Sequence, residues 1–321
     1  MNCSYQDCQE DWKDKKPSCL CGEIDYKKCS NYIGNKETVS VEEDEFPTSE
    51  NEVLNIPWSS NSLGSSDLEY ISSVRYPYII GVIGQAKSGK TTLLATLYML
   101  LRSGKSIEGY SFSGSYTLLG WEKISQFLTF NSHKKISFPP HTSANMTRVP
   151  GLLHLSLKDE NGTFQDVIFT DAPGEWFVDW GKSANDHAAV GAKWIDDAAD
   201  AFIIVADCNA FKLNIGKERH SLLQIVERMK NTNGNRPVAL AWTKSDQALD
   251  QNIKDRIFAK ITSHLPSLCA FDLAVINRTS DREIEDILVL VKSLLDNSQI
   301  KRNKLEPIQI KNEDDFFFTI R

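Results

Sequence analysis

The sequence lacks an uninterrupted apolar run of the ~20 residues that a membrane-spanning helix needs. Its start, Met-Asn-Cys-Ser-Tyr-Gln-Asp-Cys, lacks the basic and then apolar order of a secretory signal peptide. It also lacks an excess of basic residues, because 43 acidic side chains outnumber 36 basic ones and the net charge is -7. These absences argue against a membrane span, and they give no sign of a nucleic-acid partner. We therefore expect a cytoplasmic protein.

The cysteines are concentrated at the N-terminus, where five of the seven lie within the first 29 residues. In a reducing compartment such a cluster is typical of a metal site rather than of disulfides, because thiolates bind Zn²⁺ and the metal can fold a segment too short for a core. The spacing lacks the paired C-x-x-C of a zinc ribbon, so a cysteine-rich disordered tail is the alternative. The candidate Zn²⁺ ligands are Cys3, Cys8, Cys19 and Cys21, with Cys29 outlying.

The composition divides the chain into three parts. Residues 1–35 form a small cysteine-rich segment, and residues 36–74 are rich in Glu, Ser and Asn. Low hydrophobicity and like charge cannot offset the entropy of ordering a chain, which favours a linker over residues 36–74. From residue 75 to residue 321 apolar runs alternate with helical patterns, so we expect one domain there.

This alternation predicts an α/β fold, a three-layer sandwich with a mostly parallel sheet between helices. Residues 131–150 contain three prolines and are expected to be a long loop. The expected strands are Tyr78 to Ile83, Leu152 to Lys158, Asp166 to Thr170, Ala201 to Asp207, Pro237 to Trp242 and Phe271 to Ile276, with Asp314 to Ile320 as a candidate edge strand. The expected helices are Thr91 to Arg102, Trp121 to Phe130, Ala188 to Asp197, Lys217 to Met229, Gln251 to His264 and Arg282 to Leu295.

A phosphate-binding motif follows the first expected strand. The segment Gly84-Gln85-Ala86-Lys87-Ser88-Gly89-Lys90-Thr91 matches G-x-x-x-x-G-K-[ST] in full and leads into a helix pattern. Such a loop points successive N–H groups and the positive end of the helix at a polyphosphate. We expect this loop and Thr92 to bind phosphates, with Lys90 at the β- and γ-phosphates and Thr91 at Mg²⁺. The alternative is a chance glycine turn before a core helix.

A second motif ends the strand that begins at Asp166. Asp171-Ala-Pro-Gly174 has the form D-x-x-G, which places a carboxylate at the carboxyl end of a buried strand. A second contact to Mg²⁺ is needed there, and the N–H of Gly174 is expected to meet the γ-phosphate and act as a hinge. An ordinary strand followed by a turn is the alternative reading.

A third motif selects the base. Thr243-Lys244-Ser245-Asp246 follows a buried strand and has the form T-K-x-D. A carboxylate placed edge-on to guanine accepts from both N1–H and the exocyclic amine, a pair of donors that adenine does not offer, and Lys244 is expected to lie along the base plane. The alternative is a strand followed by an unrelated Lys-Ser-Asp turn.

The order of the three motifs resembles that of the translation-factor-related GTPases, the class that includes the Ras-like domains. Within this class, the cysteine-rich start and three segments resemble the bacterial double-GTPase families of conflict and anti-phage operons. These segments are Gly89-Lys-Thr-Thr-Leu-Leu-Ala-Thr-Leu-Tyr98, Phe112-Ser-Gly-Ser-Tyr-Thr-Leu118 and Thr170-Asp-Ala-Pro-Gly-Glu175. The resemblance covers about residues 75 to 295.

The resemblance implies a Ras-like P-loop fold and a GTP/GDP switch with Mg²⁺. It implies that Thr91 and Asp171 surround Mg²⁺, that Lys90 contacts the phosphates, and that Lys244 and Asp246 contact the base. It places the last base-binding loop near Asn277 to Ser280, although that stretch lacks the usual Ser-Ala-Lys. It also implies a protein effector, encoded by a neighbouring gene, in a bacterial defence system.

Catalysis needs a positioned water and countercharge at the γ-phosphate. Glu175 follows D-x-x-G, where Ras-like enzymes carry the glutamine that orients water, so we expect slow intrinsic hydrolysis because a carboxylate repels the phosphate. Arg148 is a candidate arginine finger in cis, and Thr142 or Thr147 is a candidate Mg²⁺ ligand from the first switch. Two rival functions stay open, a P-loop ATPase and a nucleotide-binding scaffold without turnover.

Overall fold

The computed structural model describes residues 62–64, 67–128, 150–183, 189–247, 249–275 and 282–297. Several expectations fall outside these ranges and stay predictions. They concern the cysteine cluster, Arg148 with the candidate threonines Thr142 and Thr147, the base-binding loop at residues 277–280, and the candidate edge strand at residues 314–320.

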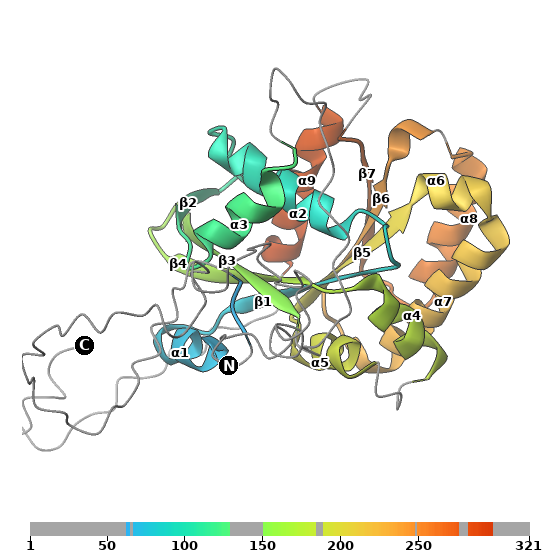
Figure 1. The fold of residues 1–321 in the computed structure, drawn as a ribbon, viewed down its shortest axis with the longest axis horizontal. Helices are drawn as coiled ribbons and strands as arrows, with labels where there is room; N and C mark the ends of the chain where they lie inside the picture. The colour runs from blue at the N-terminus through green and yellow to red at the C-terminus, as the bar shows by residue number, and fades with distance from the viewer. Residues whose placement is uncertain are drawn as a thin grey trace, which may run out of the picture. The chain divides into compact units, whose positions relative to one another are not determined.

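Within the described residues, seven strands form one sheet in the order β2-β3-β4-β1-β5-β6-β7 (Figure 1). The neighbours β4-β1, β1-β5, β5-β6 and β6-β7 are parallel, whereas β2-β3 and β3-β4 are antiparallel. The strands are β1 Tyr78–Gly84, β2 Tyr110–Gly114, β3 Gly151–Asp159, β4 Phe164–Asp171, β5 Ala201–Asp207, β6 Val238–Thr243 and β7 Leu268–Leu273. The mostly parallel sheet that the sequence predicts is therefore confirmed.

Helices cover both faces of the sheet, so the molecule has three layers (Figure 1). One core cluster lies between the sheet and α2, α3 and α9, and the other lies beneath α1, α4, α5, α7 and α8. The helices are α1 Asp67–Val74, α2 Lys90–Arg102, α3 Leu118–Ser125, α4 Gly174–Lys182, α5 Val190–Ala198, α6 Cys208–Leu213, α7 Ile215–Thr232, α8 Gln251–Thr262 and α9 Arg282–Asp296, with a short 3-10 helix, η6, at Ser245–Gln247. No helix among the described residues is both long and apolar enough to cross a membrane.

The central strands are buried on both faces, which explains why their sequences are continuous apolar runs. In β1, Ile79 and Ile83 belong to one core cluster, and Ile80 and Val82 belong to the other. Every residue of β1, β5 and β6 is buried. A parallel strand in this position needs apolar side chains at successive positions rather than at alternate ones.

Strand β2 and helices α4 and α6 were not expected from the sequence, and two expected elements are displaced along the chain. Strand β7 begins three residues earlier than expected, at Leu268; it is the last strand of the sheet among the described residues, and its middle positions are largely exposed, so it lacks the continuous buried apolar run of the central strands. Helix α3 also begins and ends earlier than expected, at Leu118 and Ser125.

Regular structure begins within the segment that we expected to be a linker. Helix α1 precedes residue 75, and Leu63 forms a β-bridge with Leu152 of β3. Leu63 and Ile71 are buried in the core, with 2% and 4% of their surfaces exposed. Leu68 packs against the same core, so the linker prediction is wrong for these residues.

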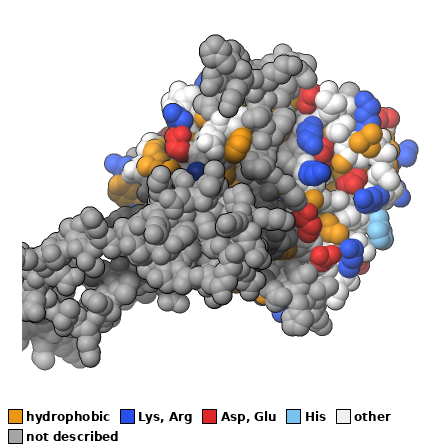
Figure 2. Space-filling model, in the orientation of Figure 1, with side chains coloured by type: hydrophobic (Ala, Val, Ile, Leu, Met, Phe, Trp, Pro, Cys, Tyr) orange, Lys and Arg blue, Asp and Glu red, His pale blue; other side chains and the backbone are white. Residues whose placement is uncertain are grey.

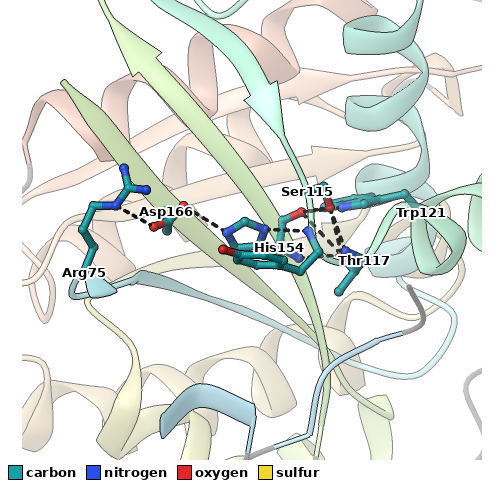
Figure 3. Close-up of polar contacts among 7 residues, drawn as sticks. Arg75, Ser115, Thr117, Trp121, His154 and Asp166 are labelled. Carbon is teal, nitrogen blue, oxygen red and sulfur yellow. Dashed lines mark hydrogen bonds and ion pairs between the residues drawn. The ribbon is translucent and has the colours of Figure 1, made fainter. Parts of the chain in front are cut away.

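A buried polar cluster joins the connection between β2 and α3 to the two strands beside it (Figure 3). The His154 ring is 1% exposed, and its Nδ1 accepts a hydrogen bond of 3.0 Å from the N–H of Tyr116. Its Nε2 therefore carries the proton and donates to Asp166 Oδ1 at 3.1 Å. Arg75, just after α1, forms an ion pair with the other oxygen of Asp166.

Side chains of α3 and of the connection before it also hydrogen-bond to the backbone of His154 (Figure 3). Its carbonyl accepts hydrogen bonds from the Ser115 hydroxyl and from Trp121 Nε1, and its N–H donates to Thr117 Oγ1. Burial raises the pKa of Asp166, but hydrogen bonds from His154 and Ser156 outweigh it and leave that pKa below its usual value. Side chains that follow β2 thus hydrogen-bond to the backbone of β3 where β2 itself has ended, so the cluster has a structural role.

Candidate nucleotide-binding site

The three motifs lie at one edge of the sheet because each follows the carboxyl end of a strand. Gly84 ends β1, Asp171 ends β4 and Thr243 ends β6. These strands lie within a run of parallel neighbours, β4-β1-β5-β6, so their carboxyl ends point the same way. This edge of a parallel sheet is where open α/β folds bind ligands.

The phosphate loop turns sharply between β1 and α2. Gly89, at the N-terminal cap of α2, has φ of 98°, a left-handed conformation that glycine adopts without strain. Lys87 also has a positive φ, 61°, which is uncommon for a residue with a side chain. The first N–H groups of α2 are therefore presented at the end of the helix, as an anion-binding loop requires.

Lys90 lies inside this loop. Its Nζ donates hydrogen bonds to the carbonyls of Gly84, at 3.0 Å, and Gln85, at 2.8 Å, and the residue is 6% exposed. Burial lowers the pKa of its ammonium from 10.5 to about 8, and the negative charges of Asp171 and Glu175 oppose this shift. The ammonium of Lys90 is thus buried among backbone carbonyls, and its pKa lies closer to neutral pH than that of an exposed lysine.

The second motif lies against the phosphate loop. Thr91 Oγ1 donates a hydrogen bond of 3.0 Å to Asp171 Oδ1, which joins two of the predicted Mg²⁺ contacts. Gly174, the first residue of α4, lies on the loop itself, because a Cβ atom there would stand 2.0 Å from the nitrogen of Ala86 and 2.2 Å from the carbonyl carbon of Gln85. No side chain fits at this position, which accounts for the glycine of D-x-x-G.

The third motif is tied to the first by hydrogen bonds. Thr243 Oγ1 donates to the carbonyl of Ser88 at 2.6 Å, and Lys244 Nζ donates to the carbonyl of Lys87 at 3.3 Å. Lys244 has φ of 53° and so turns the chain sharply after β6. Asp246 follows in η6 and accepts from Gln247 Nε2 at 2.8 Å.

Family comparison supports this arrangement. A model of the family described as Double-GTPase 2 matches residues 78–298, a range that contains all three motifs. The chain belongs to the Double-GTPase 2 family. A search of curated proteins found no match.

Two solved structures are similar to parts of this Double-GTPase 2 chain. One is the RocCORdC fragment of Roco2 from Methanosarcina barkeri bound to GDP, with 18% identity and a TM-score of 0.39 over 70% of this chain and 51% of that one. The other is a mutation variant of SsGBP, with 14% identity and a TM-score of 0.37 over 73% of this chain and 61% of that one. The chain thus spans about half to three fifths of the length of these structures.

One residue that contacts the candidate site of this Double-GTPase 2 chain was missed in the sequence. Asp207, at the end of β5, forms an ion pair with Lys244 and accepts hydrogen bonds from the N–H groups of Asn209 and Ala210 at the start of α6. Asp207 and Thr243 are paired residues of β5 and β6. The available signal was a carboxylate at the carboxyl end of a buried strand, the same signal that identified Asp171.

Proposed function

We propose that the protein is a molecular switch that binds GTP and GDP with Mg²⁺ and hydrolyses GTP to GDP and phosphate. The observation that carries the proposal is the hydrogen bond between Thr243 and the carbonyl of Ser88. It connects the strand that ends in T-K-x-D to the phosphate loop, so one bound nucleotide can meet both motifs. Membership of the Double-GTPase 2 family supports the same function.

In this proposal each motif has a separate role. The loop from Gly84 to Thr92 surrounds the phosphates with N–H groups, and Lys90 adds a positive charge. Gly174 contacts the γ-phosphate and so distinguishes GTP from GDP. Asp246 accepts from the edge of guanine, and Lys244 lies along the ring.

The residues present fit Mg²⁺. Thr91 and Asp171 offer a hydroxyl and a carboxylate within hydrogen-bond distance of each other, and hard oxygen ligands are those that Mg²⁺ prefers. A Mg²⁺ ion held there supplies positive charge to the phosphate oxygens. Among the described residues, no cluster of three or more His, Cys, Asp or Glu side chains forms another metal site, and zinc at the N-terminal cysteines stays a separate hypothesis.

Hydrolysis is expected to be slow without a partner. Glu175 lies in the first turn of α4, and its charge acts on Lys90. In this proposal Glu175 accepts a proton from the attacking water. A carboxylate at this point repels the negatively charged γ-phosphate unless the positive charge of Lys90 offsets the repulsion. We further propose that an operon-encoded protein partner of a bacterial defence system accelerates the reaction or reads its state.

Nucleotide titration tests the proposal. The purified protein is titrated with fluorescent GDP and ADP in Mg²⁺, beside Lys90→Ala and Asp246→Asn. We expect GDP to bind at least about a hundredfold more tightly than ADP, because guanine offers the Asp246 carboxylate a pair of donors that adenine does not offer. Both variants should lose GDP, whereas Asp255→Asn, an exposed carboxylate on α8, should not.

A reversal of base preference separates recognition from misfolding. In Asp246→Asn the amide can donate to the C2 carbonyl of xanthine, so xanthosine diphosphate should replace GDP as the preferred ligand. A preference for ADP, or an unchanged GDP affinity in Asp246→Asn, would establish the ATPase alternative. The scaffold alternative would be established by tight GDP binding without multiple-turnover phosphate release, both for the protein alone and in the presence of the proteins encoded in the same operon.

A further inference from the structure

The segment that carries the T-K-x-D motif lies between two ion pairs. On one side Lys244 of the motif pairs with Asp207, the last residue of β5. On the other side Lys254 of α8, the helix that follows the motif, pairs with Asp272 of β7. Strands β5 and β7 are the two neighbours of β6, which leads into the motif. Each ion pair therefore joins the segment to a different flanking strand.

Lys254 is buried, which is rare for a lysine unless its charge is paired. The residue is 7% exposed, and among the described residues Asp272 is the sole hydrogen-bond partner of its ammonium. The ammonium also lies over the ring of Trp242, 5.9 Å from the ring centre, within the range of attraction between a cation and an aromatic face. Trp242 belongs to β6 and Asp272 to β7, so one ammonium of α8 contacts both strands.

The two ion pairs and the motif surround one buried thiol. Burial raises the pKa of the Cys208 thiol to about 12, the positive charge of Lys254 lowers it, and the negative charges of Asp272, Asp207 and Asp246 raise it further. Charges that act on the same thiol lie near it and near one another. The pair of Lys254 with Asp272 is therefore close to Asp246, the carboxylate proposed to read guanine.

The short helix η6, which contains Asp246, has few contacts of its own. The N–H of Gln247 donates to the carbonyl of Lys244 at 2.9 Å, and Lys212 of α6 donates to the carbonyl of Gln247 at 3.3 Å in an exposed contact. None of the residues of η6, all of which the structure describes, is buried. The placement of Asp246 therefore depends on the elements at the two ends of the segment, β6 and α8.

Charges of both signs lie on the surface around these helices. Helices α6, α7 and α8 lie on the right in Figure 1, and in the same orientation Figure 2 shows Lys and Arg side chains interspersed with Asp and Glu on the described surface there. Such a mixture gives no broad field of one sign to orient a base, because opposite charges at short spacing cancel at a distance. Recognition of guanine therefore depends on where individual groups such as Asp246 stand.

We propose that Lys254 is a positioning residue for base recognition. It holds the start of α8 against β6 and β7, and it thereby fixes the position of Asp246 relative to guanine. Lys254 acts through Asp246 rather than by contact with the nucleotide. The inference rests on the proposed function, because it concerns the contact between Asp246 and the base.

The test compares the unmodified protein with Lys254→Met. Methionine removes the ammonium but keeps an apolar side chain of similar length, and it leaves no buried charge unpaired, because the Asp272 side chain is 51% exposed. Dissociation constants are measured for GDP, inosine diphosphate and inorganic pyrophosphate. Inosine lacks the exocyclic amine of guanine, so the ratio of the constants for inosine diphosphate and GDP reports how well Asp246 meets the base. Pyrophosphate reports on the phosphate loop alone.

In the unmodified protein we expect inosine diphosphate to bind roughly tenfold or more weakly than GDP, because Asp246 then accepts from one donor instead of two. In Lys254→Met this ratio should fall to about threefold or less, whereas pyrophosphate affinity should change by less than about twofold, because a misplaced carboxylate affects the base alone. Lys254→Arg, which keeps the ion pair, should retain the ratio. Lys260→Met, at an exposed lysine of the same helix, is the matched control and should also retain it.

A second variant tests the same ion pair from its exposed end. Asp272→Asn removes the negative charge but leaves a carbonyl oxygen that can accept from the Lys254 ammonium, so folding should be preserved. The ratio should fall by at least about twofold in this variant, in the same direction as in Lys254→Met. Thermal unfolding of each variant checks that the fold is intact.

An unchanged ratio in Lys254→Met and in Asp272→Asn would overturn the inference. An equal loss of affinity for GDP, inosine diphosphate and pyrophosphate would also overturn it, because it would indicate a general structural role. Failure of the proposed function looks different, since the unmodified protein would then show no preference for GDP over ADP and would have no base recognition for Lys254 to support. If that preference is present and the ratio does not respond to the variants, the role of Lys254 alone is refuted.

Discussion

Gly174 is the residue at which the second motif touches the phosphate loop. In Gly174→Ala the added Cβ would meet the backbone of Ala86 at 2.0 Å, so α4 must shift. We expect GTP hydrolysis to fall at least about tenfold, because the γ-phosphate contact is lost, while GDP affinity changes little. Phosphate release and GDP titration measure the two effects. Gly216→Ala is the matched control, since the nearest atom to its Cβ would be 3.9 Å away.

Lys90 makes nucleotide binding sensitive to alkaline pH. Its pKa of about 8 in the free protein lies below the value of 10.5 for an exposed lysine, so the ammonium loses its proton as the pH rises through 8. Phosphates bind the protonated form, and GDP affinity should therefore fall by up to about tenfold per pH unit above 8. Titrations between about pH 7 and 9.5 test this. The slope should vanish in Lys90→Ala, and a flat profile in the unmodified protein would contradict the prediction.

The effect of Lys90 on folding stability has the opposite pH dependence to its effect on GDP affinity. A lysine pKa that is lower in the folded state than in the unfolded state weakens folding while the group is protonated. This penalty is present below pH 8 and is relieved as the pH rises from about 8 towards 10.5. Bound phosphate removes the same penalty at neutral pH by pairing the ammonium, so nucleotide binding and folding are linked at this residue.

At the scale of elements, α4 is held from its C-terminal end. Arg228 of α7 donates to the carbonyls of Gly181, at 3.3 Å, and Lys182, at 3.1 Å. Arg228→Ala should destabilise the protein by about 1 to 3 kcal/mol and speed amide hydrogen exchange in α4 more than elsewhere. Denaturant unfolding and exchange mass spectrometry measure these effects. Arg219→Ala, an exposed arginine on the same helix, should leave exchange in α4 unchanged.

The elements that carry the motifs could be predicted because short, continuous stretches of sequence specify them. Strand β1 is a run of apolar residues that stops at glycine, and α2 repeats apolar residues at helical spacing. Elements whose stability comes from distant contacts could not be predicted in the same way. Helix α1 is only eight residues long, and the packing of Leu63, Leu68 and Ile71 against the core shows why it forms.

The same distinction applies to the site. Gly84 to Thr91 and Asp171 to Gly174 were found because each motif is continuous in the sequence. Asp207 was missed because its partner, Lys244, is 37 residues away and comes beside it only through the pairing of β5 with β6. Likewise, the hydrogen bond from Thr243 to Ser88 spans 155 positions.

At the scale of the whole molecule, the folded unit extends N-terminal to the first strand. Leu63 and Ile71 are buried, and full burial of each side chain contributes about 1.5 to 3 kcal/mol. A chain that starts at residue 75 should therefore be about 3 to 6 kcal/mol less stable than one that starts at residue 62. Chemical unfolding of the two shortened chains tests this. Equal stabilities would contradict the role given to these two residues.

The packing of α4 also gives the molecule an optical reporter of its own. Trp176 and Trp180 lie on α4 at 6% and 3% exposure, and the Trp176 ring lies so close to Gly191 of α5 that a Cβ there would be 2.3 Å from it. Indole emission depends on how dry its surroundings are. A displacement of α4 relative to α5 would change the surroundings of that ring, so such a movement can be followed in the unlabelled protein by its intrinsic fluorescence.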